Sequence, residues 1–361
     1  KKGYFKLVSE DYFKSVYPSI VYDTAADAFN FVLSRRPQNN FQVDFGGVIA
    51  TRSFSTIFLG LHYYYFNRTL IHASANFYAG SFMKSAEVKY RMDLPNFGQF
   101  YIEPQVTFNA WDYLEGRDVV IDKFSPTVLD RIDRKIGASI GFPLGRQYKA
   151  SLHGFYLNND DKYINTDVLT SIDTLDNMQL NGFRTGISLT SGSMNRKQYP
   201  SQGKSFSLNA DWFTVKERYT PGSTSNISQN VEENHSWLRA RITLQQYFKS
   251  GFYSSGYYFD GVLSNQPLFT NYQGSLITAP GFYPLQDSKT LLLQNFRAYN
   301  YVAGGWRNVF TIRNKLDIRL EAYAFKPFEA IVEGQNQEGI LDDSFEKMFF
   351  AGTAGMVYHS T

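Results

Sequence analysis

Residues 84–94 read KSAEVKYRMDL, and from Ser85 onward polar and apolar side chains alternate without interruption. In an extended strand, successive side chains point to opposite faces. One face then carries Ala86, Val88, Tyr90, Met92 and Leu94, and the other carries Ser85, Glu87, Lys89, Arg91 and Asp93. The stretch predicts a β-strand with one apolar and one charged face, and a slip of one residue would exchange the two faces.

The same alternation returns at three further places, in residues 100–109, 205–212 and 316–324. A soluble β-sandwich produces this pattern when its polar face lies in water. A membrane barrel produces it when its apolar face lies in lipid. Alternation by itself therefore leaves both architectures open.

The connections between these segments favour the barrel. Short links at 67, 95–98, 143–147, 249–251 and 314 alternate with long polar segments at 112–133, 158–181, 216–234, 264–299 and 329–347. Outer-membrane barrels have short periplasmic turns and longer extracellular loops, whereas a sandwich has no reason to sort its connections in this way. The prediction is an all-β fold, a transmembrane antiparallel β-barrel with about fourteen strands in this chain. The strands are expected near 41–50, 56–66, 69–82, 84–94, 99–111, 134–142, 148–157, 182–191, 204–215, 236–248, 252–263, 300–312, 315–327 and 348–361.

Composition excludes several other classes. The 361 residues contain no run of about 20 apolar side chains, so membrane-spanning helices are not expected. The net charge of +3 comes without a basic block, so no nucleic-acid partner is expected. Aromatic residues make up 17% of the chain, and many stand near predicted strand ends, as in the interfacial girdles of barrels. An aromatic sugar-binding platform is the alternative for these rings.

The first 39 residues follow a different pattern, because acidic and basic side chains interrupt any apolar face. They predict a small mixed unit with a strand at 4–8, a helical turn after Ser9 and two strands around a turn at 23–27. The expected domains are therefore 1–39, the end of a periplasmic module, and 40–361, the barrel. The last predicted strand ends abruptly at Thr361, from which we expect the natural protein to continue.

Several of these segments resemble a known superfamily. Residues 3–7 (GYFKL), 35–40 (RRPQNN) and 41–50 (FQVDFGGVIA) resemble the last POTRA repeat and the first barrel strand of the outer-membrane assembly superfamily. That superfamily includes the BAM-type insertases and the two-partner-secretion transporters. Residues 199–203 (YPSQG) resemble its short periplasmic turn, and residues 45–52 (FGGVIATR) are similar to the barrel start of the branch that carries a patatin-like phospholipase domain.

The resemblance implies roles for particular residues. It implies a barrel of sixteen strands, so that two C-terminal strands would be absent from this chain, and a barrel seam that includes Phe41, Val43 and Phe45. Pro200 and Gly203 would form the periplasmic turn, and Pro280, Gly281 and Phe282 would form the tip of a loop that folds into the lumen. The superfamily places an arginine before this glycine, whereas Pro280 stands there in this chain, which puts insertase or translocase activity in doubt.

No catalytic residues are predicted. A patatin-type lipase needs a G-x-S-x-G elbow, and the sequence has none, so a phospholipase domain would have to precede Lys1. His62 and His72, placed opposite each other by a turn at Asn67, are weak candidates for a metal pair, with ordinary lumen side chains as the favoured interpretation. No cofactor is expected.

Charged side chains are expected in the lumen. Arg91 and Glu103 are predicted to form an ion pair across a hairpin. Arg239, Arg241, Arg307 and Arg319 could attract anions, although simple balance against nearby acidic residues is favoured over that role.

The leading hypothesis is an integral barrel of a Gram-negative outer membrane that anchors or exports an attached domain, with its lumen plugged by the loop at 264–299. An outer-membrane insertase or secretion pore, a passive diffusion channel and a soluble β-sheet enzyme or lectin are the alternatives. The expected partners are outer-membrane lipid and lipopolysaccharide, with an attached periplasmic or exported domain and other outer-membrane proteins as further candidates.

Overall fold

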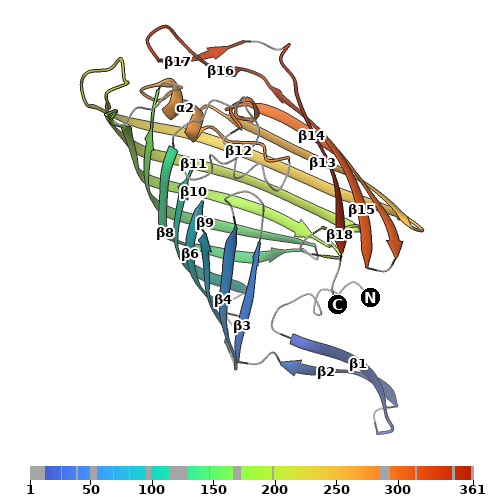
Figure 1. Ribbon diagram of the computed structural model, residues 1–361. Coiled ribbons are helices and arrows are strands. Elements are labelled where there is room, and N and C mark those ends of the chain that lie inside the picture. Colours follow the sequence, from blue (N-terminus) through green and yellow to red (C-terminus); the bar gives the residue numbers. More distant parts are fainter. Residues whose placement is uncertain are drawn as a thin grey trace.

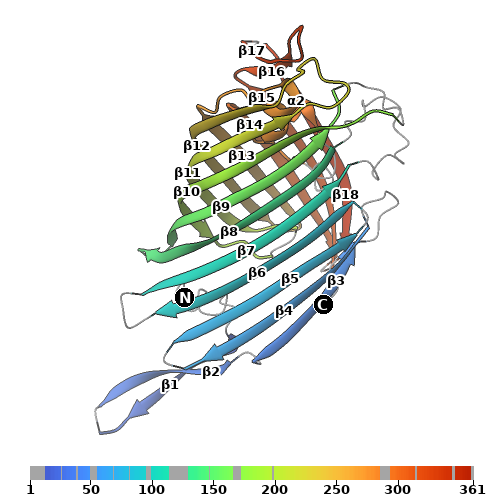
Figure 2. The ribbon, with the colours of Figure 1, turned by 90° about the vertical axis from the view of Figure 1, so that its left-hand side faces the viewer.

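The computed structural model describes residues 13–25, 27–37, 40–48, 55–67, 69–80, 82–94, 99–113, 129–145, 147–165, 172–196, 199–284, 293–313, 315–343 and 346–358. Within them, fourteen antiparallel strands form one sheet that curls into a barrel (Figures 1 and 2). The strands are β3 (Phe41–Val48), β4 (Thr56–Phe66), β5 (Leu70–Gly80), β6 (Met83–Leu94), β7 (Phe100–Asp112), β8 (Leu129–Leu144), β9 (Tyr148–Tyr163), β10 (Asp176–Gly192), β11 (Gly203–Thr220), β12 (Val231–Ser250), β13 (Tyr253–Ser264), β14 (Tyr301–Arg313), β15 (Leu316–Pro327) and β18 (Phe349–Tyr358).

Each strand of this sheet pairs with its neighbours along the chain, from β3 at one edge to β18 at the other. The predicted strand count and their order are confirmed. Among the described residues, no backbone pairing joins β3 to β18, and Figure 1 shows these two strands at the front of the barrel.

The two faces of the sheet differ as the alternation predicts. Large apolar side chains point outward from eight different strands and remain 45–58% exposed; they are Val88, Val106, Ile136, Leu152, Ile187, Leu238, Trp306 and Leu320. Their charged neighbours, such as Asp211 and Arg319, are buried on the inner face. The only other sheets in the described part of the chain are two small hairpins, so no second layer forms a sandwich.

Five strands, β8 to β12, continue five or six residues further than predicted at one end. The sequence pattern underestimates the length of these strands because the polar and apolar faces exchange sides at their ends. On β11, the outward positions change from Leu208 and Trp212 to Lys216 and Arg218, while Val215 and Tyr219 turn inward and are buried. Part of the polar segments that were predicted as loops is therefore strand. The band of outward apolar side chains given above is called the apolar belt. Beyond it, the barrel is polar on the outside and apolar on the inside, as a soluble protein is.

Six further elements, which form two hairpins and two short helices, complete the described structure. β1 (Phe13–Asp23) and β2 (Ala28–Pro37) form a hairpin before the barrel, around a turn where the sequence predicted one. The predicted strand at 4–8 and the helical turn after Ser9 lie outside the described residues. β16 (Ala330–Glu333) and β17 (Gly339–Asp342) form a second hairpin between β15 and β18. The helix α2 (Tyr272–Thr278) and the 3-10 helix η4 (Gln294–Phe296) lie between β13 and β14. No helix in the described ranges has the length and apolarity required to cross a bilayer.

Candidate functional site

The described residues between β13 and β14, 265–284 and 293–300, pack against the inner face of the sheet at one end of the barrel, where Figure 1 shows α2. They are called the inner loop below. The guanidinium groups of Arg131 on β8 and Arg239 on β12 donate to the carbonyl oxygens of Ile277 and Thr278, each at 3.3 Å. The inner loop is thus held from two separate parts of the barrel wall.

Local sequence explains why α2 forms at this place. Asn271 caps the helix, because its Oδ1 accepts a hydrogen bond from the Gly274 amide at 2.8 Å. The same oxygen accepts from the hydroxyl of Tyr163, on β9, at 2.8 Å. Ile277 is 1% exposed and packs with Trp237 in an apolar cluster that lies within the inward-turned ends of the strands.

The predicted tip of the inner loop is fully covered. Phe282 is 1% exposed, and its ring lies 5.9 Å from the ring of Phe325 and 6.1 Å from that of Tyr323, both on the inner face of β15. The hydroxyl of Tyr301 donates to the Gly281 carbonyl at 3.4 Å. Aromatic side chains from the barrel wall therefore form a pocket for the tip.

An arginine that the sequence reasoning missed organises the inner loop. Arg297 is 8% exposed and donates to the carbonyl oxygens of Ile277 at 3.1 Å and Ala279 at 3.0 Å, and to the hydroxyl of Tyr283 at 3.1 Å. It also forms a backbone bridge with Gly281. It is the one arginine between residues 264 and 299, and a single arginine in a long predicted loop is the sequence feature that could have identified it.

Burial also fixes the protonation of a nearby phenol. Tyr299 is 2% exposed, and this loss of water raises its pKa to about 12. Its hydroxyl therefore stays neutral and donates to the carbonyl oxygen of Ser275 at 3.3 Å.

The four predicted lumen arginines all have partners on the inner face. Arg241 makes two hydrogen bonds to Asp260, at 2.9 and 2.6 Å. Arg239 bonds to Gln266 of the inner loop, and Arg307 donates to Tyr323 at 2.8 Å and to Gln245 at 2.5 Å. Arg241 is balanced by a carboxylate, whereas the acceptors that Arg239 contacts are uncharged.

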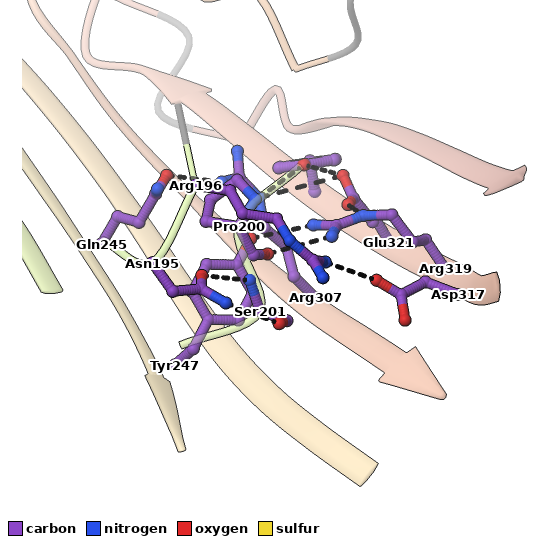
Figure 3. Close-up of polar contacts among 11 residues, drawn as sticks. Asn195, Arg196, Pro200, Ser201, Gln245, Tyr247, Arg307, Asp317, Arg319 and Glu321 are labelled. Carbon is purple, nitrogen blue, oxygen red and sulfur yellow. Dashed lines mark hydrogen bonds and ion pairs between the residues drawn. The ribbon is translucent and has the colours of Figure 1, made fainter. Parts of the chain in front are cut away.

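The turn between β10 and β11 reaches across the barrel to β15 (Figure 3). The carbonyl of Pro200 accepts a hydrogen bond from Arg319 at 3.0 Å, and Arg196 pairs with Asp317 at 3.2 Å. Gly203 has φ of +97°, and a Cβ there would lie 2.1 Å from the Ser193 carbonyl oxygen. Only glycine fits this position, which lets the turn bend inward rather than away from the barrel.

Arg319 is expected to hold this turn. Its side chain is 6% exposed, and its guanidinium also contacts Glu321 at 2.9 Å and Tyr247 at 3.0 Å, so Arg319→Ala leaves three acceptors without their cation. Hydrogen bonds to charged groups contribute about 1.5–3 kcal/mol each. We expect amide exchange in residues 199–204 to accelerate strongly, measured by hydrogen–deuterium exchange. Arg218→Ala is the control, because the Arg218 side chain is 52% exposed, its partner Glu232 is 54% exposed, and an exposed ion pair contributes less than about 1 kcal/mol. Equal exchange in both variants would show that Arg319 does not hold the turn.

The histidine pair lies elsewhere than predicted along its hairpin. His72 pairs with Tyr64 and His62 with Ser74, so the two imidazoles are diagonal rather than directly opposite. The predicted register was wrong by two residues. The rings still meet, with Nδ1 of His62 3.1 Å from Nε2 of His72, and Nε2 of His62 lies 3.3 Å from Asp44 on β3.

The remaining predicted residues lie as follows. Phe41, Val43 and Phe45 point outward from the edge strand β3 and are 53–79% exposed. Arg91 donates to Asp93 on its own strand at 2.7 and 3.0 Å and lies 4.2 Å above the Tyr101 ring. The described residues show no ion pair between Arg91 and Glu103. The guanidinium of Arg91 instead binds the carboxylate of Asp93, which lies two positions along the same face.

Comparison with known proteins supports the fold. No protein-family model matches the sequence, and no curated protein matches it. The crystal structure of BamA from Haemophilus ducreyi lacking POTRA domains 1–3 is similar to this chain, with a TM-score of 0.55 and 11% identity over 99% of this chain and 71% of that one. The chain therefore has the fold of an outer-membrane-type antiparallel β-barrel.

Two further structures give weaker matches. CdiB from Acinetobacter baumannii has a TM-score of 0.32, with 11% identity over 96% of this chain and 66% of that one. The ferric citrate transporter FecA in its unliganded form has a TM-score of 0.37, with 11% identity over 91% of this chain and 57% of that one.

Proposed function

We propose that this chain is an integral barrel of a Gram-negative outer membrane, related to the patatin-linked branch of the outer-membrane assembly superfamily, that anchors or exports an attached domain. Its outward apolar side chains face lipid and lipopolysaccharide, and the inner loop plugs its lumen. Residues 1–39 are the end of a POTRA-like module in this proposal. A G-x-S-x-G elbow in the coding sequence upstream of Lys1 would support the patatin link.

The observation that carries the plug is the burial of the inner loop against the barrel wall. Phe282 and Ile277 are each 1% exposed, and they pack against different groups of strands. Hydrogen bonds from Arg131 and Arg239 add charged donors to carbonyl oxygens that the short helix leaves open. A segment held at several points by buried contacts stays in place far longer than an ion takes to cross a pore.

The turn between β10 and β11 supports the same proposal from other residues. Ser201 is 5% exposed although it belongs to a turn, because the turn lies against Arg319 and Tyr247 rather than in solvent.

Shortening the inner loop is expected to open the barrel. Ser264 and Asn300 lie side by side, since the Ser264 amide donates to the Asn300 side chain at 2.7 Å, so a short Gly-Ser linker can replace 268–296. We expect little steady conductance from the intact chain in planar bilayers and a steady open level from the shortened one. The control replaces 330–342, the β16–β17 hairpin, in the same way. Steady conductance of the intact chain, equal to that of the shortened one, would instead favour the passive channel.

An insertase or secretion pore is the second candidate, favoured by the edge strand β3. Its outward side chains are exposed, and no described strand pairs with its free edge. This candidate predicts that photo-crosslinkers placed between Phe41 and Phe45 capture a client protein. Crosslinks to lipid alone would contradict the insertase or secretion pore and favour the anchoring function.

A further inference from the structure

We propose that Glu217, Glu233 and His235 form a binding site for one divalent transition-metal ion of the zinc type. The site lies on the inward side of β11 and β12, beyond the apolar belt, where the inner loop begins. It does not depend on the proposed plug, since binding of the metal is measured directly.

The register of the sheet brings the three side chains together. Glu217 on β11 is paired with Glu233 on β12, and His235 stands two residues along β12 on the same face. The Nε2 atom of His235 lies 2.7 Å from Glu217 and 3.9 Å from Glu233, and one ligand atom from each residue falls within 4.8 Å of the others. It is the only such group of three or more in the described part of the chain.

These distances suit a metal ion of this type. Zinc binds nitrogen and carboxylate oxygen at about 2.0–2.2 Å, so tetrahedral ligand atoms stand about 3.3 Å apart. The distances from Nε2 of His235 to Glu217 and to Glu233, 2.7 and 3.9 Å, lie on either side of this value. A shift of the imidazole by about 0.6 Å, away from Glu217 and toward Glu233, would equalise both contacts around a central ion.

Charge also favours a cation at this position. Like charges directly opposite on paired strands are destabilising, yet Glu217 and Glu233 face each other. Glu217 is completely buried, and buried carboxylates are normally paired or bound to metal. Its one ion-pair partner in the described residues is His235, which can be charged only when protonated. A divalent ion would neutralise both carboxylates while the imidazole stays neutral.

Two residues of the inner loop hold His235 and Glu217 in position to bind a metal. The ring of Phe269, from the inner loop, lies 4.7 Å from the His235 ring and fixes its plane. The Thr270 amide donates to the second oxygen of Glu217 at 3.0 Å, which orients the carboxylate as an outer hydrogen bond does in metal sites. The Thr270 hydroxyl oxygen is buried and has no hydrogen-bond partner within the described residues. The metal would therefore join β11 and β12 to the start of the inner loop.

The test is titration of the folded, metal-free full chain in detergent with zinc chloride, followed by calorimetry at neutral pH. We expect one high-affinity site per chain, and in His235→Gln and Glu233→Gln a loss of affinity at least as large as the roughly 10–100-fold caused by losing an outer hydrogen-bond partner of a ligand. Glu233 is an exposed side chain, so E233Q tests the site without risk to folding. Zinc should also slow hydrogen exchange of the Thr270 amide in the native chain but not in H235Q.

The competing zinc ligands are the His62 and His72 pair. The variant His62→Asn/His72→Asn is therefore the matched control, and we expect it to bind zinc like the native chain. Unchanged affinity in both H235Q and E233Q, or loss of binding only in the His62/His72 variant, would overturn the proposal. So would the absence of any site tighter than millimolar in the native chain.

Discussion

Leu320→Arg is expected to prevent assembly of the barrel in a membrane. Leu320 lies near the middle of β15 on the outward face and is 45% exposed, and its neighbours on that face are Ile318 and Ala322. An arginine at the bilayer midplane of such a barrel costs about 2–4 kcal/mol. The net stability of a folded chain is commonly only about 5–15 kcal/mol, so this single change removes a large share of it. Val88→Arg, at a 50% exposed outward position on β6, should act in the same way.

The measurement is heat-modifiable migration of the folded barrel after insertion into vesicles. Ser236→Arg is the matched control, because Ser236 also points outward from the sheet but lies beyond the apolar belt, opposite Thr214. We expect this variant to assemble normally. Native-like assembly of both L320R and V88R would show that the apolar face does not contact lipid.

Asp260→Ala is expected to produce the largest loss of stability on the inner face. Asp260 is completely buried and accepts hydrogen bonds from Arg241, Thr243 and Tyr301, the last at 3.1 Å. The Arg241 side chain left behind is 35% exposed, so the loss comes mainly from the missing hydrogen bonds to the carboxylate, which contribute about 1.5–3 kcal/mol each. Tyr301 also contacts Gly281, so the tip of the inner loop should become mobile as well.

Urea unfolding in detergent measures this loss, with hydrogen exchange at residues 279–284 as the local signal. The double variant Asp260→Leu/Arg241→Met separates charge from packing, since replacing both members of a buried pair by apolar residues is often nearly neutral. We expect the double variant to regain most of the lost stability. A D260A variant as stable as the native chain would mean that the pair contributes nothing.

Much of the barrel was predictable because strand period is a local property. Val88 and Leu320 fall on the apolar face that alternation predicts, and both are exposed on the outward side of the sheet. The inverted ends of the strands were missed for a related reason. Lys216 and Arg218 on the outward face look like loop residues until the buried positions that alternate with them, Val215 and Glu217, are seen to face inward.

The sequence pattern could not predict the register between paired strands. The register of His62 and His72 depends on the turn around Asn67, and an error of two residues there leaves every side chain on its predicted face. The periodic signal cannot detect such an error, because a shift by two preserves the pattern.

The sequence by itself determined which side chains of each strand share a face and which of the two faces is apolar over most of the strand, because the pleat repeats every two residues. Only the tertiary structure decided that Phe282 enters an aromatic pocket, that Pro200 reaches Arg319, and that Glu217 meets Glu233 and His235. The first two contacts arise because the sheet curls and brings distant segments together, and the third arises from the register between β11 and β12; neither leaves a periodic trace in the sequence.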